Sequence, residues 1–169
     1  STIMYDKFVN AMPFYRQEKD FKTRFGVTIG RGTMAHWTIY CAKNYFAPVV
    51  EYFERLLNQR KYVAADETPI QVLKEEGRKA QSKSYVWLFR SGDDGQNPMI
   101  VYKYHATRNG DAAAEFFKDS NVGTYINVDG YAGYNKLKSF KRCACYAHIR
   151  RYFVEAIPKD KEKDFTNPA

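Results

Sequence analysis

The sequence predicts an α/β protein, in which a mixed β-sheet is flanked by helices and preceded by a helical region. Two observations lead to this fold class. Up to residue 60 the apolar side chains recur at helical spacing, whereas from Lys61 they form short runs separated by turns that contain Gly, Asp or Pro. We therefore divide the chain into a helical region, residues 1–60, and a sheet-containing core, residues 61–169.

The helical region is expected to begin with two helices joined at a glycine. Residues 15–25 are polar and charged and are followed by Gly26, and Thr28 or Thr33 is expected to cap the next helix. That next helix is expected to carry one apolar face, made of Met34, Trp37, Ile39 and Tyr40. Two helices in succession over residues 14–42 indicate either a DNA-contacting helix-turn-helix or a hairpin that serves packing alone. In the first case, Arg31 and Lys43 are candidate DNA contacts.

The clearest helical pattern covers residues 44–60. Its apolar side chains follow i, i+3, i+4, i+7 spacing, and Pro48 suits the first turn of a helix. We expect the whole apolar stripe to pack in the core: Phe46, Val49, Val50, Phe53, Leu56 and Leu57.

The core begins with extended segments. Residues 62–65 predict a buried strand, and Pro69 is expected to begin a separate extended piece over residues 70–73. Residues 84–89 and 99–104 predict two more strands, which complete an antiparallel meander.

Helical and extended segments then alternate. The expected order is a helix at 112–118 capped by Asn109 or Asp111, a strand at 124–129, a short helix, an extended piece at 142–146 and a helix at 147–156. A three-strand meander followed by strands that alternate with helices is the layout of an RNase H-like mixed sheet, with antiparallel and parallel strands together.

Composition limits the classes of function. The 169 residues carry a net charge of +8, which favours a polyanionic partner such as DNA, or else only a basic soluble surface. The three cysteines show no disulfide framework, which indicates a reducing compartment. There is no run of apolar residues long enough to cross a membrane and no secretory signal, so we expect a cytoplasmic protein.

Two carboxylates are candidate catalytic and metal-binding residues. Asp66 and Asp129 each follow an apolar run, and side chains at strand ends converge if the strands are neighbours. Two close carboxylates repel each other unless a cation lies between them, and oxygen ligands favour magnesium or manganese in a two-metal site for phosphoryl transfer. The alternative is that both residues only stabilise turns. Glu67 is expected to point to the opposite face from Asp66.

A second cluster of polar residues lies in the sequence C-A-C-Y-A-H at residues 143–148. Cys143, Cys145 and His148 are the types of residue that bind zinc, but a closed site needs a fourth ligand that this stretch does not supply. Cys143 and Cys145 share one face of an extended chain, which predicts that they point toward the core. Arg150 and Arg151 are candidate phosphate contacts or ordinary surface charges.

Several of these stretches resemble transposases of the bacterial insertion-sequence-66 family. The resemblance rests on A-D-E-T-P-I-Q-V-L at 65–73, D-G-Y-A-G-Y-N at 129–135 and C-Y-A-H-I-R-R-Y-F at 145–153, with Y-R-Q-E at 15–18 and G-T-M-A-H-W at 32–37. It implies an RNase H-like transposase with three catalytic acids, of which Asp66 and Asp129 match the first two. Cys145 and His148 match a C-x-x-H element that helps to organise the site.

The resemblance also implies a function and its partners. Members of the family cut DNA at the ends of a mobile element, join it to target DNA and self-associate in the full-length protein. The third acid of the family is a Glu well beyond the C-x-x-H element, and no residue up to Ala169 matches it. We therefore expect a fragment that is inactive alone, with a catalytically inert DNA-binding module or a metal-dependent nuclease of the same fold as alternatives.

Overall fold

The computed structural model describes residues 2–157, which form two compact units that divide between Tyr52 and Phe53. The first unit contains α1 (Thr2–Phe8), α2 (Phe14–Phe25) and α3 (Arg31–Cys41), followed by a π-helical stretch, η1 (Ala42–Phe46), that continues into α4 (Ala47–Asn58). The Gln17 side chain in α2 is buried, and its amide donates hydrogen bonds to the carbonyl oxygens of Ile3 and Met12, at 3.2 and 3.0 Å. These bonds hold α1 and the α1–α2 turn against α2.

Two details predicted for this unit are wrong. Gly26 does end α2, in the left-handed conformation with φ of 66°, but neither Thr28 nor Thr33 caps α3, which follows Gly30 without a side-chain cap. The expected apolar face of α3 does not form, because only Met34 is buried and the other three side chains of the set are exposed. At about 100° per residue, Ile39 lies about 140° around the helix from Met34, so these side chains cannot share one face.

The apolar stripe of residues 46–57 is also less buried than predicted. Phe46, Val49 and Phe53 are all exposed, and in α4 the buried residues are Leu57 and Asn58. The reason is that only the part of α4 from Phe53 onward belongs to the unit that contains the sheet. There Asn58 donates a hydrogen bond to the Phe116 carbonyl oxygen at 2.9 Å and accepts one from Ser120 at 2.7 Å.

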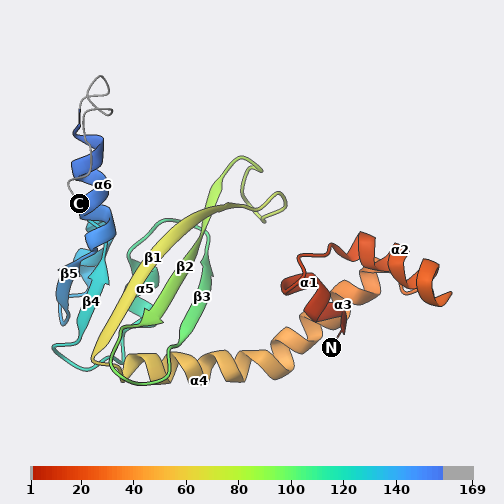
Figure 1. Cartoon of the computed structure of the whole chain (residues 1–169), viewed down its shortest axis with the longest axis horizontal. Helices are drawn as coiled ribbons and strands as arrows, with labels where there is room; N and C mark the ends of the chain where they lie inside the picture. Colours follow the sequence, from red (N-terminus) through yellow and green to blue (C-terminus); the bar gives the residue numbers. More distant parts are fainter. Residues whose placement is uncertain (1, 158–169) are drawn as a thin grey trace, which may run out of the picture. The chain divides into compact units, whose positions relative to one another are not determined.

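The second unit is built on a five-stranded mixed sheet (Figure 1). Its strands are β1 (Tyr62–Gln71), β2 (Lys83–Ser91), β3 (Ile100–His105), β4 (Tyr125–Val128) and β5 (Lys141–Ala144), in the spatial order β3-β2-β1-β4-β5. The pairs β1–β2 and β2–β3 are antiparallel, whereas β1–β4 and β4–β5 are parallel. The predicted fold class is therefore confirmed, and the strand order and directions are consistent with an RNase H-like fold.

The first strand differs from the prediction. β1 runs without interruption from Tyr62 to Gln71, so Asp66 lies inside the strand and Pro69 does not begin a separate piece. Beyond Ala64, β1 pairs with β2 alone, because β4 pairs with it only up to that residue. A strand with one open edge tolerates a proline, which explains why Pro69 does not interrupt it.

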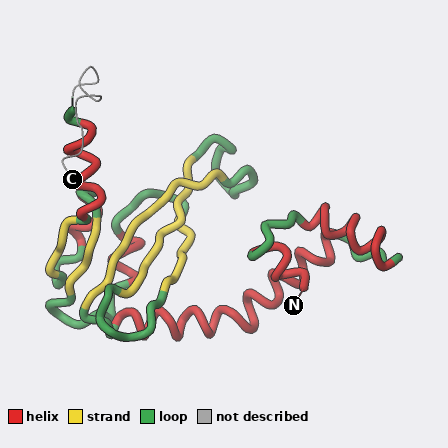
Figure 2. Tube along the Cα trace, in the orientation of Figure 1, coloured by secondary structure: helices red, strands yellow, loops and turns green. Residues whose placement is uncertain are grey.

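The core lies on one face of the sheet, where α5 (Asp111–Phe116) packs. In Figure 2 this helix is the short red segment behind the yellow strands. The rings of Phe89 on β2 and Phe116 on α5 stack with centroids 3.9 Å apart, and Phe117 meets Phe89 edge-on at 5.2 Å. Gly110 is the N-cap residue of α5 and supplies no side-chain cap, but the side chain of Asn109, one of the two predicted caps, accepts a hydrogen bond from the Asp111 backbone N–H at 3.2 Å.

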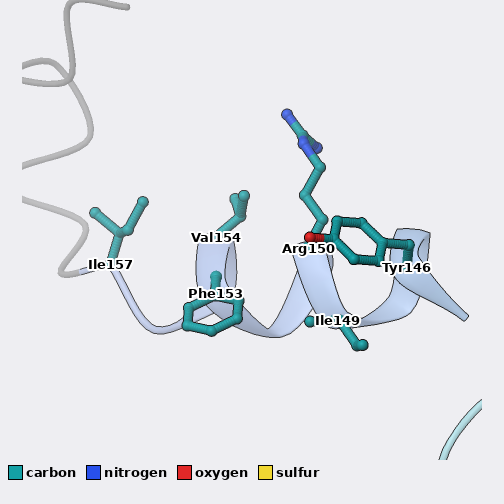
Figure 3. A pocket seen from close by; sticks show the side chains of 6 residues that line it. All are labelled: Tyr146, Ile149, Arg150, Phe153, Val154 and Ile157. Carbon is teal, nitrogen blue, oxygen red and sulfur yellow. The ribbon is translucent and has the colours of Figure 1, made fainter. Parts of the chain in front are cut away.

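Two further helical segments follow β4 and β5, a 3-10 helix η2 (Ala132–Lys136) and helix α6 (Tyr146–Glu155). No residue of α6 is buried. One side of it lines a shallow pocket of about 320 Å³ (Figure 3), formed by Tyr146, Ile149, Arg150, Phe153, Val154 and Ile157. Among the described residues, no helix is both long and apolar enough to span a membrane.

A buried ion pair fixes the β2–β3 turn to the segment that leads into β1. Arg60 Nη1 lies 2.7 Å from Asp94 Oδ1, and the two side chains are only 6% and 8% exposed. Arg60 Nη2 also donates a hydrogen bond to the Asn97 carbonyl oxygen. Removing one partner of a buried pair leaves an uncompensated charge, which costs far more than the pair itself contributes.

We expect Asp94→Asn to lower the free energy of unfolding by about 3 kcal/mol, because the Arg60 charge then stays buried without its counter-ion. Urea denaturation followed by tryptophan fluorescence measures this change. Asp93→Asn is the matched control, since Asp93 is exposed, and it is expected to change stability by less than about 0.5 kcal/mol. Equal effects of the two substitutions would show that the ion pair does not stabilise the fold.

Candidate active site

The parallel pairing of β1 with β4 brings the two predicted acids to the same place in the sheet. Ala64 pairs with Asn127, so the same register, continued by two residues, places Asp129 opposite Asp66. Neighbouring strands lie about 4.8 Å apart, which is within reach of two carboxylates that share one metal ion. The two acids thus lie just beyond the last residue pair that β1 and β4 form, although Asp66 does not lie at the end of its strand.

The surroundings of Asp66 and Asp129 differ. Asp66 is exposed, and its Oδ1 accepts a hydrogen bond from the Glu67 backbone N–H at 2.9 Å. The Asp129 side chain is 16% exposed, and its Oδ1 accepts a hydrogen bond from the Tyr131 backbone N–H at 2.8 Å. Asp129 therefore also stabilises the turn after β4, as the alternative interpretation of the sequence predicted, and this bond leaves Oδ2 available for other contacts.

Glu67 points away from Asp66 and into the protein, where its side chain is 1% exposed. Its Oε2 accepts a hydrogen bond from the Tyr134 hydroxyl at 2.5 Å. Its Oε1 accepts one from Arg108 Nε at 2.7 Å and lies 2.6 Å from Arg108 Nη2. The same Nη2 is 3.7 Å from Asp129 Oδ2, so one guanidinium lies between the buried glutamate and the candidate metal ligand.

The electrostatics of this cluster keep Tyr134 and Arg108, the two donors to Glu67, protonated. Burial, together with the hydrogen bond and charge of Glu67, raises the pKa of Tyr134 far above its ordinary value, and the charges of Asp129 and Asp66 add to this effect. Burial opposes the charge on Arg108, but the hydrogen bond and charge of Glu67 outweigh it and raise the pKa of Arg108. Tyr134 thus stays a neutral donor and Arg108 a cation.

Neither Arg108 nor the buried role of Glu67 was predicted from the sequence. Arg108 lies in the loop between β3 and α5, where no periodic pattern marks a residue for a particular contact. Its guanidinium lies over the Tyr131 ring, 4.2 Å from the centroid, and the Tyr131 hydroxyl donates to the Arg108 carbonyl oxygen at 2.7 Å. The only sequence signal was the position of Tyr131 and Tyr134 in the D-G-Y-A-G-Y stretch beside Asp129.

The C-x-x-H element lies next to the second acid. Asp129, Cys145 and His148 all line one hollow of about 290 Å³, together with Arg142, Cys143, Ile149 and Tyr152 among others. Cys143 is exposed and Cys145 half-buried, so the prediction that both point into the core is wrong. His148 Nδ1 is buried and has no hydrogen-bond partner within the described part of the chain.

The structure favours neither a zinc site nor a complete three-ligand site within residues 2–157. No three side chains of His, Cys, Asp or Glu in this range lie close enough together to hold a metal ion. The donor atoms of Asp66 and Asp129 are oxygens, which suit magnesium or manganese better than zinc. Binding of a divalent cation by these two carboxylates therefore stays a prediction.

The predicted DNA-contacting residues are all exposed. Arg150 and Arg151 lie on α6, which begins directly after Cys145 and carries His148 in its first turn. In the first unit Arg31 begins α3, with its guanidinium 5.8 Å from the centroid of the Tyr15 ring, and Lys43 lies in η1. Exposure is necessary for phosphate contacts, and these four assignments remain predictions.

A close approach of two glycines holds the Arg108 loop beside the turn after Asp129. A Cβ atom on Gly110 would overlap the backbone of Gly133, so only glycine allows this contact. Gly110 is the N-cap residue of α5 and Gly133 lies in η2, and Arg108 and Tyr134 are near neighbours of these residues in the sequence.

Comparison of the chain with models of protein families identifies its family. The model of a protein family described as "Transposase IS66 family" matches residues 1–168, which is nearly the whole chain. No curated protein and no solved structure matches the chain.

We expect Gly110→Ala to lower the free energy of unfolding by about 2 kcal/mol, because the added methyl group forces the Gly133 backbone away. Thermal unfolding followed by circular dichroism measures the change. Gly32→Ala is the control, since a Cβ there meets no atom within 4 Å and Gly32 lies in helix α3. That substitution is expected to stabilise the chain by about 0.5 kcal/mol, so a loss of the same size at both positions would contradict the explanation.

Proposed function

The chain belongs to the IS66 family of transposases, and we propose that Asp66 and Asp129 hold divalent metal ions in its catalytic core. The observation that supports this proposal best is the parallel pairing of β1 with β4, whose last pair, Ala64 with Asn127, is followed two residues later by Asp66 on one strand and by Asp129 after the other. The family implies that the full-length protein binds DNA and cuts or transfers its strands.

A divalent ion at this site would activate the attacking oxygen and stabilise the charge that develops on the phosphate. The contribution of the chain is to hold oxygen ligands at fixed positions. Asp66 is exposed on β1 and is reachable by a large substrate such as DNA. Asp129 is held in its turn by the hydrogen bond from Tyr131, which fixes one oxygen and leaves the other available.

The C-x-x-H element is proposed to support the second acid. Cys145 and His148 line the same hollow as Asp129, and His148 belongs to the first turn of α6. A buried ring nitrogen without a partner is costly, so His148 Nδ1 is suited to a hydrogen bond that forms when ligand, metal-bound water or DNA enters the hollow. In this arrangement His148 orients groups near Asp129 and does not itself bind zinc.

DNA is proposed to contact the core through Arg150 and Arg151, which lie on the helix that begins at the edge of this hollow. Such contacts would position the phosphate backbone without reading its sequence. A second candidate function is DNA binding without catalysis, led by residues 14–42. It is favoured by the helix pair α2 and α3, which the structure forms over those residues with Arg31 exposed.

We expect Asp66→Asn and Asp129→Asn each to weaken Mn²⁺ binding by at least about tenfold, because each removes a charged oxygen ligand. Electron paramagnetic resonance of free Mn²⁺ during a titration measures the affinity. The control is Asp93→Asn, which changes the same formal charge at an exposed position outside the site. Metal-dependent DNA cleavage by the full-length transposase is expected to be lost with the first two substitutions only. Unchanged Mn²⁺ affinity in both variants would overturn the assignment.

The two candidate DNA surfaces can be separated by their salt dependence. Arg150→Ala combined with Arg151→Ala is expected to reduce the slope of log K against log salt by about 1.8, as the loss of two phosphate contacts requires. Fluorescence anisotropy with a short DNA duplex measures the slope at several salt concentrations. Arg31→Ala combined with Lys43→Ala makes the same change of charge in the first unit. If only this second pair reduces the slope, DNA binding belongs to the first unit and not to α6.

A further inference from the structure

One guanidinium between two carboxylates poses a problem for a metal site. Arg108 Nη2 is 2.6 Å from the buried Glu67 and 3.7 Å from Asp129. The longer distance exceeds hydrogen-bonding range. Arg108 is therefore hydrogen-bonded to Glu67, whereas its interaction with Asp129 is electrostatic only. A cation that moved fully onto Asp129 would occupy the oxygen that a metal ion needs.

Glu67 is anchored in a way that keeps Arg108 where it is. Each of its two oxygens accepts from a different side chain. Oε1 accepts a hydrogen bond from Arg108, and Oε2 accepts one from the Tyr134 hydroxyl. Tyr134 is itself 1% exposed, and its ring meets Trp87 edge-on with centroids 5.9 Å apart. The carboxylate is therefore tied to the aromatic core and cannot follow Arg108 toward Asp129.

Arg108 is also held from its other side. Its guanidinium lies over the Tyr131 ring, and the hydroxyl of that ring donates to the Arg108 backbone. The Arg108 side chain is nevertheless 42% exposed, so it has room to change its partner if the attraction of Glu67 is removed. The position of the Arg108 guanidinium is then determined by its attraction to the negative charge of Glu67.

We propose that Glu67 is a positioning residue that holds the Arg108 guanidinium off the Asp129 carboxylate and so leaves Asp129 free to bind a metal ion. This inference rests on the proposed function, because it takes Asp129 to be a metal ligand. Glu67 and Arg108 cancel each other's charge, so the negative charge of Asp129 remains available to a cation. Without Glu67, the uncompensated Arg108 pairs with Asp129 and competes with the metal.

The test compares three variants by Mn²⁺ titration with electron paramagnetic resonance. Glu67→Gln keeps the size of the side chain and removes its charge, and we expect it to weaken Mn²⁺ binding by about tenfold or more. Adding Arg108→Gln to that variant removes the competing cation as well, and is expected to restore the affinity to within about threefold of the unaltered chain. Arg108→Gln alone is expected to bind Mn²⁺ at least as tightly as the unaltered chain.

A merely structural role of Glu67 gives a different pattern. If Glu67 only stabilised the fold, the double variant would lose a further buried contact and bind Mn²⁺ no better than Glu67→Gln. That result would overturn the proposal, as would unchanged affinity in Glu67→Gln. Circular dichroism checks that each variant is folded. If Glu67→Gln does not fold, Arg108→Gln alone still tests the proposal. Weaker Mn²⁺ binding by Arg108→Gln would contradict the idea that Arg108 competes with the metal ion for Asp129.

Asp129→Asn, measured in parallel, separates this proposal from the proposed function. Loss of Mn²⁺ binding in Asp129→Asn together with unchanged affinity in Glu67→Gln would leave the metal site standing and remove only the role of Glu67. If Asp129→Asn binds Mn²⁺ as tightly as the unaltered chain, or if neither binds it, the metal site itself is wrong.

Discussion

The parallel pairing of β1 with β4 is the constraint on which the candidate site depends. On one side of these strands, Val63 and Ala65 lie in the core with Ile126 and Val128. On the other side, the rings of Tyr62 and Tyr125 stack with centroids 5.3 Å apart. These two sets of contacts fix the register, since a shift by one residue would turn the core side chains outward. The pairing ends two residues before Asp66 and Asp129, and the alternation of β1 turns Glu67 inward.

The charges near the ends of β1 and β4 bear on the proposed binding of a cation. Asp66, Glu67 and Asp129 carry three negative charges, and Arg108 provides one positive charge. The remaining formal charge of −2 is the charge that one divalent ion neutralises. The pairing of Arg108 with Glu67 decides where that charge is located, because it leaves the two aspartates as the uncompensated groups. In the proposed site, a structural ion pair and a metal site would thus depend on each other within one sheet.

Much of this arrangement could be predicted from the sequence, and the errors have physical causes. The apolar runs that precede Asp66 and Asp129 indicated two strands without showing that they are neighbours, and the alternation of a strand indicated that Glu67 faces away from Asp66. The end of β1 was misplaced, because a proline interrupts a central strand but not one with an open edge, and the sequence does not show which edge is open. The prediction that the apolar stripe of α4 is buried was wrong for a similar reason. The spacing of apolar residues shows which side chains share a face of the helix, but it does not show whether another element covers that face.

Arg108 could not be found in this way, because its role depends on contacts between segments far apart in the sequence. It lies 41 residues from Glu67, and the glycine contact between Gly110 and Gly133 brings its loop to the turn after β4. The adjacent acids of the A-D-E-T-P stretch then have roles that cannot be exchanged. The first is exposed, and the second is long enough to meet both Tyr134 and Arg108 inside the protein. An aspartate at position 67 would be one methylene shorter and would have to give up one of these partners. The order Asp-Glu therefore follows from the alternation of one strand, which turns the first carboxylate toward solvent and the second toward the cation that neighbours Asp129.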